Sequence, residues 1–243
     1  MSRPAPWASA VLAQASVEAR LTARRGENVL AMVGVPVAVL LFVTLVLAPG
    51  TVGVALPGTL AIALVASGLV NLGIAAAYER GYGVLKRLGG SPLGRSGLIT
   101  AKLAVVLAIG LAQVVALLAV AALLGWRPGP GASIAALLVT TVVGSATFAG
   151  LGLTIAGSLR PEAALVVANM LFLLALAFGG VLVPIGDLPA PVASVARLSP
   201  VGALAEAFGA ALGNGASAAP PLGILVVWAA LAVIAAARLF RWD

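Results

Sequence analysis

The 243-residue chain contains no cysteine and no histidine. Without cysteine it can form no disulfide, thiol nucleophile or thiolate metal site, and without histidine it lacks the ligand on which haem and most zinc sites depend. An intramembrane serine protease would need a histidine base, and an aspartyl protease would need two aspartates within the membrane. The only aspartates are Asp187 and Asp243, both predicted in loops. The composition therefore disfavours an enzyme and predicts no metal site in this chain.

Charged residues are scarce as well. They make up 9% of the chain, and 62% of the residues are hydrophobic, whereas a soluble domain carries roughly 25% charged residues. The apolar residues fall in runs of about 20, the length that a helix needs to cross a bilayer. The runs do not alternate apolar with polar residues, so a transmembrane barrel is not expected. We expect an all-α, polytopic membrane protein, because helices satisfy their own backbone polar groups in lipid.

Six apolar runs predict a single transmembrane domain of six transmembrane helices. Residues 1–28 precede them, and their amphipathic pattern predicts a cytoplasmic interfacial helix from about Trp7 to Ala23. Pro36 lies within the first run and is expected to kink it, which a neighbouring helix can tolerate by satisfying the freed carbonyl. Residues 184–221 are rich in proline and hold two apolar pieces too short to span, which predicts a helical hairpin that is either re-entrant or lies on the surface. The predicted spans are about 29–48, 58–77, 98–124, 132–158, 163–183 and 222–237.

The distribution of basic residues predicts the orientation. Cytoplasmic loops carry an excess of Lys and Arg, and with a cytoplasmic N-terminus only Arg127 and Arg197 of the 14 basic residues fall outside. Both termini are thus expected in the cytoplasm, with residues 184–221 outside the cell. The net charge of +7 follows from this topology rather than from nucleic-acid binding. Arginine far outnumbers lysine amid abundant Ala, Gly and Val, which favours a bacterial source and hence the bacterial inner membrane.

Residues 78–102 form the densest polar segment of the chain. Val84, Leu85 and Leu88 recur at helical spacing, so a short amphipathic helix is predicted over about 79–88, ended by Gly89 and Gly90. Ser91 and Pro92 then suit the start of another helix. From these residues alone, an ordinary basic cytoplasmic loop and a docking element for another protein are equally good interpretations.

The order of residues in this segment resembles that of the permease family of type-2 ATP-binding-cassette (ABC) exporters. The resemblance extends to the six spans, the basic interfacial helix and the proline-rich hairpin before the last span, so it covers nearly the whole chain, although only this segment is specific. The residues that carry the resemblance are Glu79, Arg80, Gly83, Leu85 to Leu88, Ser91 to Leu93, and Lys102.

The resemblance implies that residues 79–97 form a coupling loop, whose helix fits a groove on a separate ATPase subunit. Charged contacts there would come from Glu79, Arg80, Lys86 and Arg87, whereas Val84, Leu85 and Leu88 would face the membrane helices or the groove. It also implies a second permease chain, identical or related, in the lipid membrane. The chain's two lysines, Lys86 and Lys102, lie in no P-loop. ATP and magnesium are therefore expected in the partner, and no cofactor in this chain.

Polar residues elsewhere allow two interpretations each. Asn71, Gln113 and Asn169 lie within predicted spans, where they either hydrogen-bond between helices or line a substrate path. The small residues of 144–152 are expected to allow close helix packing. In the hairpin, Asp187, Arg197 and Glu206 form either an outer gate, as the resemblance suggests, or part of a surface cap. No acidic residue is predicted in mid-span, which disfavours a proton relay.

These observations predict the membrane subunit of an ATP-driven exporter. The apolar spans favour a hydrophobic or amphipathic cargo such as a lipid, a lipid-linked glycan or a drug. The alternatives are an ion-coupled secondary carrier, which the missing intramembrane carboxylates disfavour, and an ABC permease with a role in cofactor biogenesis such as haem-related export.

Overall fold

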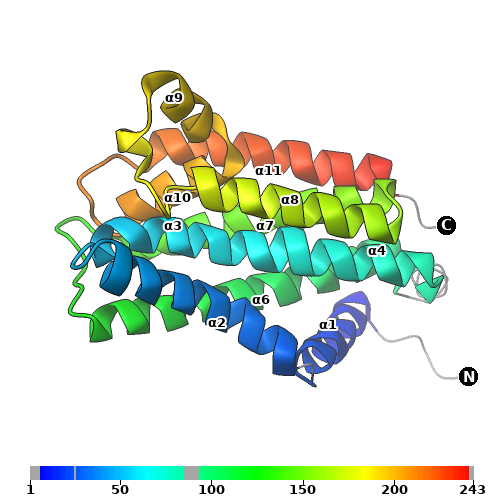
Figure 1. The fold of residues 1–243 in the computed structure, drawn as a ribbon. Helices are drawn as coiled ribbons and strands as arrows, with labels where there is room; N and C mark the ends of the chain where they lie inside the picture. Colours follow the sequence, from blue (N-terminus) through cyan, green and yellow to red (C-terminus); the bar gives the residue numbers. More distant parts are fainter. Residues whose placement is uncertain (1–5, 25, 85–92, 241–243) are drawn as a thin grey trace, which may run out of the picture.

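The computed structural model describes residues 6–24, 26–84 and 93–240. This part of the chain is helical and contains no strand. Figure 1 shows long helices running side by side, with α1 at one end of the bundle and α9 at the other. We call these the α1 end and the hairpin end. The α-helices are α1 (Trp7–Arg24), α2 (Gly26–Phe42), α3 (Val52–Val65), α4 (Gly73–Gly81), α6 (Gly94–Leu123), α7 (Ile134–Ser158), α8 (Pro161–Phe178), α9 (Ala190–Leu198), α10 (Pro200–Ala211) and α11 (Ala219–Leu239).

Short π-helical and 3₁₀ segments join or extend some of these α-helices. Two π-helical segments, η1 (Val43–Leu47) and η2 (Ala66–Leu72), continue α2 and link α3 to α4. A 3₁₀ turn, η3 (Ile185–Asp187), precedes α9. Because η2 follows α3 and precedes α4 without a break, the second span is one long helix with a wide turn inside it.

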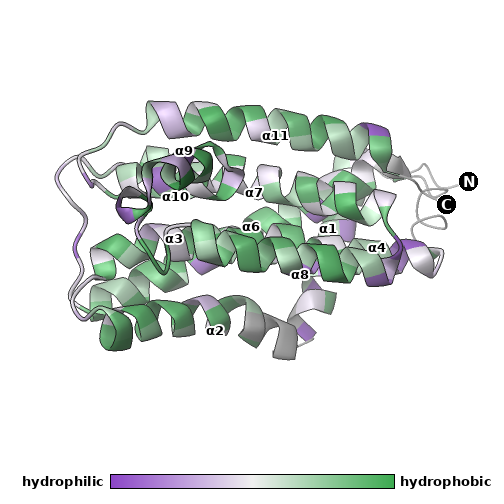
Figure 2. Ribbon diagram, turned by 45° about the horizontal axis from the view of Figure 1, so that its top comes forward, coloured by the Kyte–Doolittle hydropathy of each residue, from purple (hydrophilic) through white to green (hydrophobic). Residues whose placement is uncertain are grey.

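The described helices are long and apolar enough for a polytopic membrane protein. Five of them could span a bilayer, and Met32–Leu47 is a shorter apolar helix. Figure 2 shows hydrophobic residues along α8, α11 and the coloured part of α2, whereas hydrophilic residues gather towards the ends of the bundle. The predicted all-α polytopic fold is therefore confirmed. The spanning helices run over Val52–Gly81, Ser96–Leu123, Ile134–Ser158, Pro161–Phe178 and Ala219–Leu239.

Several helix ends differ from those predicted. The second span begins at Val52 rather than near residue 58, so Pro57 lies inside α3. Helix α8 ends at Phe178 rather than near residue 183, because Gly179 closes the helix and Gly180 adopts a φ of +75°, a conformation that favours glycine. The last span starts at Ala219, where Pro220 and Pro221 occupy the first turn, a position at which missing N–H groups cost little.

Glycines of α7 allow its neighbours to approach closely, as residues 144–152 predict. A Cβ added at Gly150 would lie 2.9 Å from the Ala232 carbonyl carbon of α11, and one added at Gly152 would overlap the Gly68 carbonyl oxygen of η2. Lipid tails are as apolar as the helix side chains, so the hydrophobic effect does not drive helices together inside a bilayer. Close backbone packing of this kind therefore supplies much of the attraction between helices. Helix α7 is thereby held between α11 and the second span.

At Pro36, a side chain of α6 supplies a backbone hydrogen bond that α2 lacks. Proline has no N–H, so in α2 the carbonyl four residues earlier, that of Met32, loses its intrahelical partner. Gln113 of α6 donates from Nε2 to this carbonyl at 2.8 Å, and its side chain is only 1% exposed. The expected rescue of the carbonyl freed by Pro36 is therefore present: Gln113 of the neighbouring helix α6 donates to the Met32 carbonyl.

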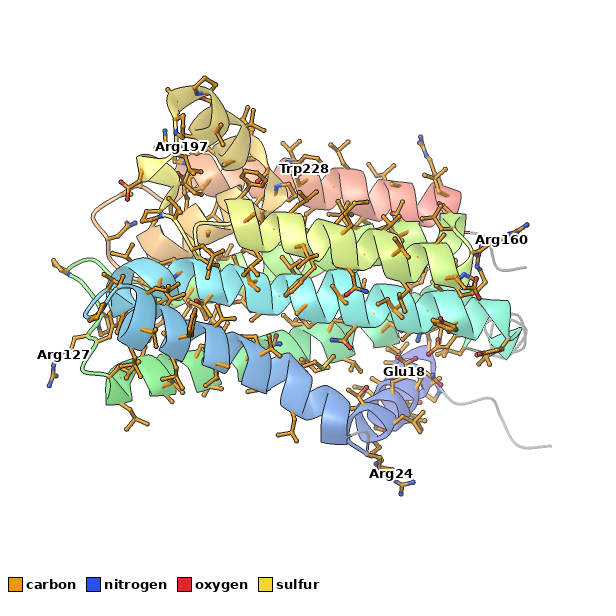
Figure 3. All side chains as sticks on the ribbon, in the orientation of Figure 1. Glu18, Arg24, Arg127, Arg160, Arg197 and Trp228 are labelled. Carbon is orange, nitrogen blue, oxygen red and sulfur yellow. The ribbon has the colours of Figure 1, made fainter. Side chains whose placement is uncertain are left out.

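The hairpin consists of one buried and one superficial helix, α10 and α9. Nearly all residues of α10 are buried among α3, α7 and α11, although the helix is too short to cross a membrane. Its last carbonyls, on Ala211 and Leu212, accept hydrogen bonds from Ser133 N at 2.9 Å and Gly129 N at 3.0 Å. Helix α9 lies on the outside, and Trp228 Nε1 of α11 donates to the Leu198 carbonyl at its end (Figure 3). The predicted pair of short helical pieces is thus present, with α10 inserted into the bundle.

Candidate functional site

The polar segment predicted to couple the protein to an ATPase leaves the bundle at the α1 end. Helix α4 ends at Gly81, and the chain turns through Tyr82 and Gly83, whose φ is +69°. The prediction of one uninterrupted helix over 79–88 is therefore wrong, because the positive φ of Gly83 breaks it. Leu85, Lys86, Arg87 and Leu88 lie outside the described residues, and Val84 is partly buried beside the turn.

Lys102 of α6 is a buried cation between two carboxylates. Its Nζ lies 2.8 Å from Glu79 Oε2 of α4 and 3.2 Å from Glu18 Oε1 of α1, and only 5% of its side chain is exposed. Gln14 Nε2 donates to Glu18 Oε1 at 3.0 Å. Figure 3 marks Glu18 at the α1 end of the bundle. A lysine needs such partners when it is buried, because an unpaired charge is costly away from water.

Arg80 attaches the end of α4 to a different neighbour. Its guanidinium donates to the Gly157 carbonyl at 2.9 Å and also to the Leu159 carbonyl. These carbonyls lie at the C-terminal end of α7, where the last backbone acceptors of a helix have no intrahelical donor and where positive charge is favoured. Arg80 therefore satisfies the end of α7 as well as fixing the turn between α7 and α8.

Two adjacent residues thus connect the start of the polar segment to three other helices, α1, α6 and α7. Glu79 reaches α1 and α6 through Lys102, and Arg80 reaches the α7–α8 turn. Sequence reasoning assigned both side chains to contacts with an ATPase. In the structure they hold contacts within this chain, and a contact of either with a partner stays a prediction. The residues that complete the network, Glu18 and Lys102, could not be paired from a separation of 84 positions in sequence.

The three intramembrane amides lie in three different environments. Asn71 of η2 lines a pocket of about 130 Å³ together with Glu18, Glu79 and Lys102, and its Nδ2 donates to the Ala66 carbonyl at 3.1 Å. Gln113 is buried against Met32, as described above. Asn169 lies on the exposed side of α8, where Nδ2 donates to the Leu165 carbonyl at 2.8 Å. Neither Gln113 nor Asn169 lines the pocket that Asn71 lines, and a role of the three amides along a substrate path stays a prediction.

Of the three residues predicted as an outer gate, the structure brings two together. Arg197 Nε of α9 donates to Glu206 Oε1 of α10 at 3.0 Å, with side chains 53% and 35% exposed. Asp187 is exposed in η3 and takes part in none of the ion pairs found in the described chain. An exposed ion pair contributes roughly 0–1 kcal/mol, so the Arg197–Glu206 pair connects the two hairpin helices only weakly.

An apolar groove of about 570 Å³ lies beneath the hairpin, between α8, α9 and the second span. Sequence reasoning did not find it, because its walls come from helices far apart in the chain. Its one polar lining residue, Ser199, is already hydrogen-bonded to Ala196 O and Gly202 N. The lining residues are Val65, Leu69, Phe148, Leu151, Leu171, Leu174, Ala175, Phe178, Pro191, Val192, Val195, Ala196, Ser199, Pro200 and Val201.

Comparison with known proteins identifies the family of the chain. No curated protein matches it. Residues 11–212, which include α10 and every preceding membrane helix, match the family described as ABC-2 type transporter. This match covers most of the chain and contains both the Glu79–Lys102 network and the apolar groove. The chain therefore belongs to the ABC-2 type transporter family, as a membrane-spanning permease.

Proposed function

We propose that this permease exports a hydrophobic or amphipathic cargo, such as a lipid, a lipid-linked glycan or a drug, through the apolar groove beneath the hairpin. The groove is the observation that carries the proposal. Its volume of about 570 Å³ falls within the roughly 300–1,000 Å³ typical of small-molecule sites. Its polar atoms are already satisfied within the chain, so an apolar occupant leaves none of them unpaired.

The groove also opens towards the surroundings of the bundle. Leu174 and Phe178 of α8 and Val192 and Val195 of α9 line it, yet each is at least 37% exposed. In a bilayer these side chains would face acyl chains, so an apolar molecule could enter laterally without crossing a polar barrier. The direction of transport follows from the family resemblance to exporters and is part of the proposal.

The energy for this transport would come from a separate ATPase subunit that binds ATP and magnesium and docks on residues 79–92. Glu79 and Arg80, at the start of that segment, contact Lys102 and the end of α7. A displacement of the docked segment would therefore be transmitted to α1, α6 and α7 together. The complex would contain two permease chains in the bacterial inner membrane, with both termini in the cytoplasm.

Substitution of one groove residue tests the cargo proposal. Val195 lines the groove and is 71% exposed, so Val195→Asp places a carboxylate there without disturbing a buried residue. Leu198→Asp is the matched control, because Leu198 lies on the same helix, is 61% exposed and does not line the groove. A charge in an apolar site is costly, and we expect a loss of roughly tenfold in affinity, which corresponds to about 1.4 kcal/mol.

The measurement uses the permease reconstituted with its ATPase in vesicles that contain a short-chain fluorescent phospholipid. We expect Val195→Asp to raise the phospholipid concentration that half-stimulates ATP hydrolysis by roughly tenfold, and Leu198→Asp to leave it unchanged. Equal effects of the two variants, or no stimulation of the unmodified protein by any apolar probe, would contradict an apolar cargo in this groove.

A further inference from the structure

A small polar pocket of about 130 Å³ lies at the α1 end of the bundle, where α1, α2, η2, α4 and α6 meet. The ion pairs of Lys102 with Glu18 and Glu79 form part of its wall. Passage of a cargo through the apolar groove gives this pocket no role. Its polar lining residues are Glu18, Thr22, Ser67, Asn71, Glu79 and Lys102.

The pocket carries one negative charge in excess. Lys102 Nζ lies 2.8 Å from Glu79 Oε2 and 3.2 Å from Glu18 Oε1, so one ammonium group faces two carboxylates. Among the described residues, no other basic side chain forms an ion pair with either carboxylate. Figure 3 shows Arg24, on the same helix as Glu18, on the side of α1 away from the bundle. A second, monovalent cation would balance the pocket, because a carboxylate partly withdrawn from water favours a partner of opposite charge.

The polar atoms that remain free in the pocket are acceptors, so they require a ligand that donates. Lys102 approaches Glu79 Oε2 outside hydrogen-bond geometry, and this buried oxygen has no donor among the described residues. Asn71 uses its Nδ2 to donate to the Ala66 carbonyl at 3.1 Å, which leaves Oδ1 as an acceptor. Ser67 Oγ donates its proton within its own helix and retains its lone pairs. A primary ammonium group, with one positive charge and three N–H donors, matches this set.

The lining distinguishes a primary ammonium group from other cations. Quaternary ammonium groups are bound by aromatic rings, and none of the described residues that line the pocket is aromatic. A divalent metal ion would bring one charge more than the pocket can balance, and the described chain holds no group of three or more acidic side chains able to bind a metal. The volume is that of about four water molecules, enough for an aminoalkyl group but not for a whole amphiphile.

We propose that this pocket binds the primary ammonium group of an amphiphilic cargo, with Glu79 and Asn71 as its acceptors. Leu21 lines the pocket and is 55% exposed, so the apolar part of the molecule can extend from the pocket along α1 into lipid. The headgroup of an aminophospholipid and the amine of an amphiphilic drug present the same chemistry. The inference rests on the proposed function and narrows its cargo to amines.

The second span connects this pocket with the apolar groove. Ser67 and Asn71 of η2 line the pocket, whereas Leu69 of the same segment lines the groove. With the α1 end in the cytoplasm, as the basic residues predict, the pocket would take the amine from the inner leaflet. The pocket would then select the cargo before its apolar part reaches the groove.

Headgroup selectivity tests the site, measured by native mass spectrometry of the permease bound to its ATPase in maltoside micelles. Phosphatidylethanolamine and phosphatidylcholine with identical acyl chains differ in a primary against a quaternary ammonium group. Dodecylamine, dodecyltrimethylammonium and dodecanol form a matching single-chain series. We expect each primary amine to bind roughly tenfold more tightly than its quaternary counterpart, and dodecanol to bind no better than the latter. Selectivity between the phospholipids assigns the site to a lipid headgroup, and selectivity in the single-chain series alone assigns it to a drug.

Substitutions in the pocket locate the selectivity. Glu79→Gln and Asn71→Leu each remove an acceptor and should abolish most of the tenfold preference. Glu162→Gln is the control and should retain it, because Glu162 is an exposed carboxylate at the start of α8 that does not line the pocket. Asn71 lies outside the coupling segment, so Asn71→Leu carries the test if Glu79→Gln prevents assembly with the ATPase.

The outcomes separate this inference from the proposed function. Equal binding of all headgroups would overturn the ammonium site and leave the apolar groove, which Val195→Asp tests, intact. A preference for primary amines that survives both pocket substitutions would overturn this pocket as the site. Selective binding of amines that never stimulate ATP hydrolysis would contradict their role as cargo.

Discussion

Gln113→Leu tests whether a side chain of one helix completes the backbone of another. Pro36 leaves the Met32 carbonyl without a donor in α2, and Gln113 Nε2 supplies one at 2.8 Å. Leucine has a similar volume but no donor, so the substitution would leave the carbonyl unsatisfied in an interior where Gln113 is only 1% exposed. The expected result is a less stable permease with an unchanged fold.

The magnitude follows from two opposed effects. An unsatisfied buried acceptor costs about 1–3 kcal/mol. The same substitution removes Gln113 Oε1, which is buried and has no hydrogen-bond partner in the described structure, and this offsets part of the loss. Interhelical hydrogen bonds in membranes contribute about 0.6 kcal/mol on average. We therefore expect Gln113→Leu to lower the free energy of unfolding by about 1 kcal/mol.

Pro36→Ala distinguishes the loss of this hydrogen bond from a general loss of packing. Alanine restores an N–H at position 36, which can donate to Met32 in the ordinary helical pattern. In that background Gln113→Leu should have little effect, giving an interaction energy of about 1 kcal/mol in the double-mutant cycle. Pro57→Ala in α3 is the matched control, since Pro57 is also an intrahelical proline, whereas the carbonyl that Gln113 satisfies belongs to Met32 of α2.

The assay is reversible unfolding in mixed micelles, with the free energy measured for the wild type, both single variants and the double variant. The reasoning is refuted if Gln113→Leu and Pro36→Ala are additive within about 0.5 kcal/mol, or if Pro57→Ala suppresses the effect of Gln113→Leu equally well. Either result would mean that Gln113 stabilises the bundle by shape and not by its donor.

Three further substitutions test other contacts. Lys102→Met should lower stability by about 2–3 kcal/mol because it leaves two carboxylates together without a cation; in the same unfolding assay Glu79→Gln should restore part of the loss, and no restoration would contradict the ion-pair account. Arg80→Lys cannot satisfy two carbonyls with the same geometry, so hydrogen exchange in residues 158–164 should quicken roughly tenfold, about 1.4 kcal/mol, whereas unchanged exchange would contradict its role at the α7–α8 turn. Gly152→Ala should lower the free energy of unfolding by about 1–3 kcal/mol through overpacking. Gly34→Ala is the control and should be neutral or stabilising, because a Cβ added there meets nothing within 4 Å. Equal melting temperatures of the two variants would contradict the close packing of α7.

The coupling segment illustrates the limit of prediction from sequence. Its polarity and its place between two apolar runs located it correctly at the end of the second span. The periodicity of Val84, Leu85 and Leu88 suggested a single helix over 79–88. The positive φ of Gly83 interrupts that helix before the periodic residues begin. Local pattern also could not reveal that Glu79 and Arg80 already have partners, because those partners lie on α1, α6 and α7.

The sequence by itself determined that the protein is a bundle of membrane helices. Its apolar runs match the thickness of a bilayer, and each helix satisfies its own backbone, so span length and helicity are local properties. It also determined that Pro36 would need a donor from elsewhere, because the missing N–H is a property of the residue itself.

Only the tertiary structure decided which residues meet. The donor to Met32 is 81 positions away, and the lysine between Glu18 and Glu79 is 84 positions from the first of them. The apolar groove and the exposed position of Asn169 likewise depend on how α8 and the hairpin pack. In lipid, apolar side chains surround every helix on all sides, so hydrophobic pattern does not distinguish an inward face from an outward one, and close packing and polar contacts between helices make that choice.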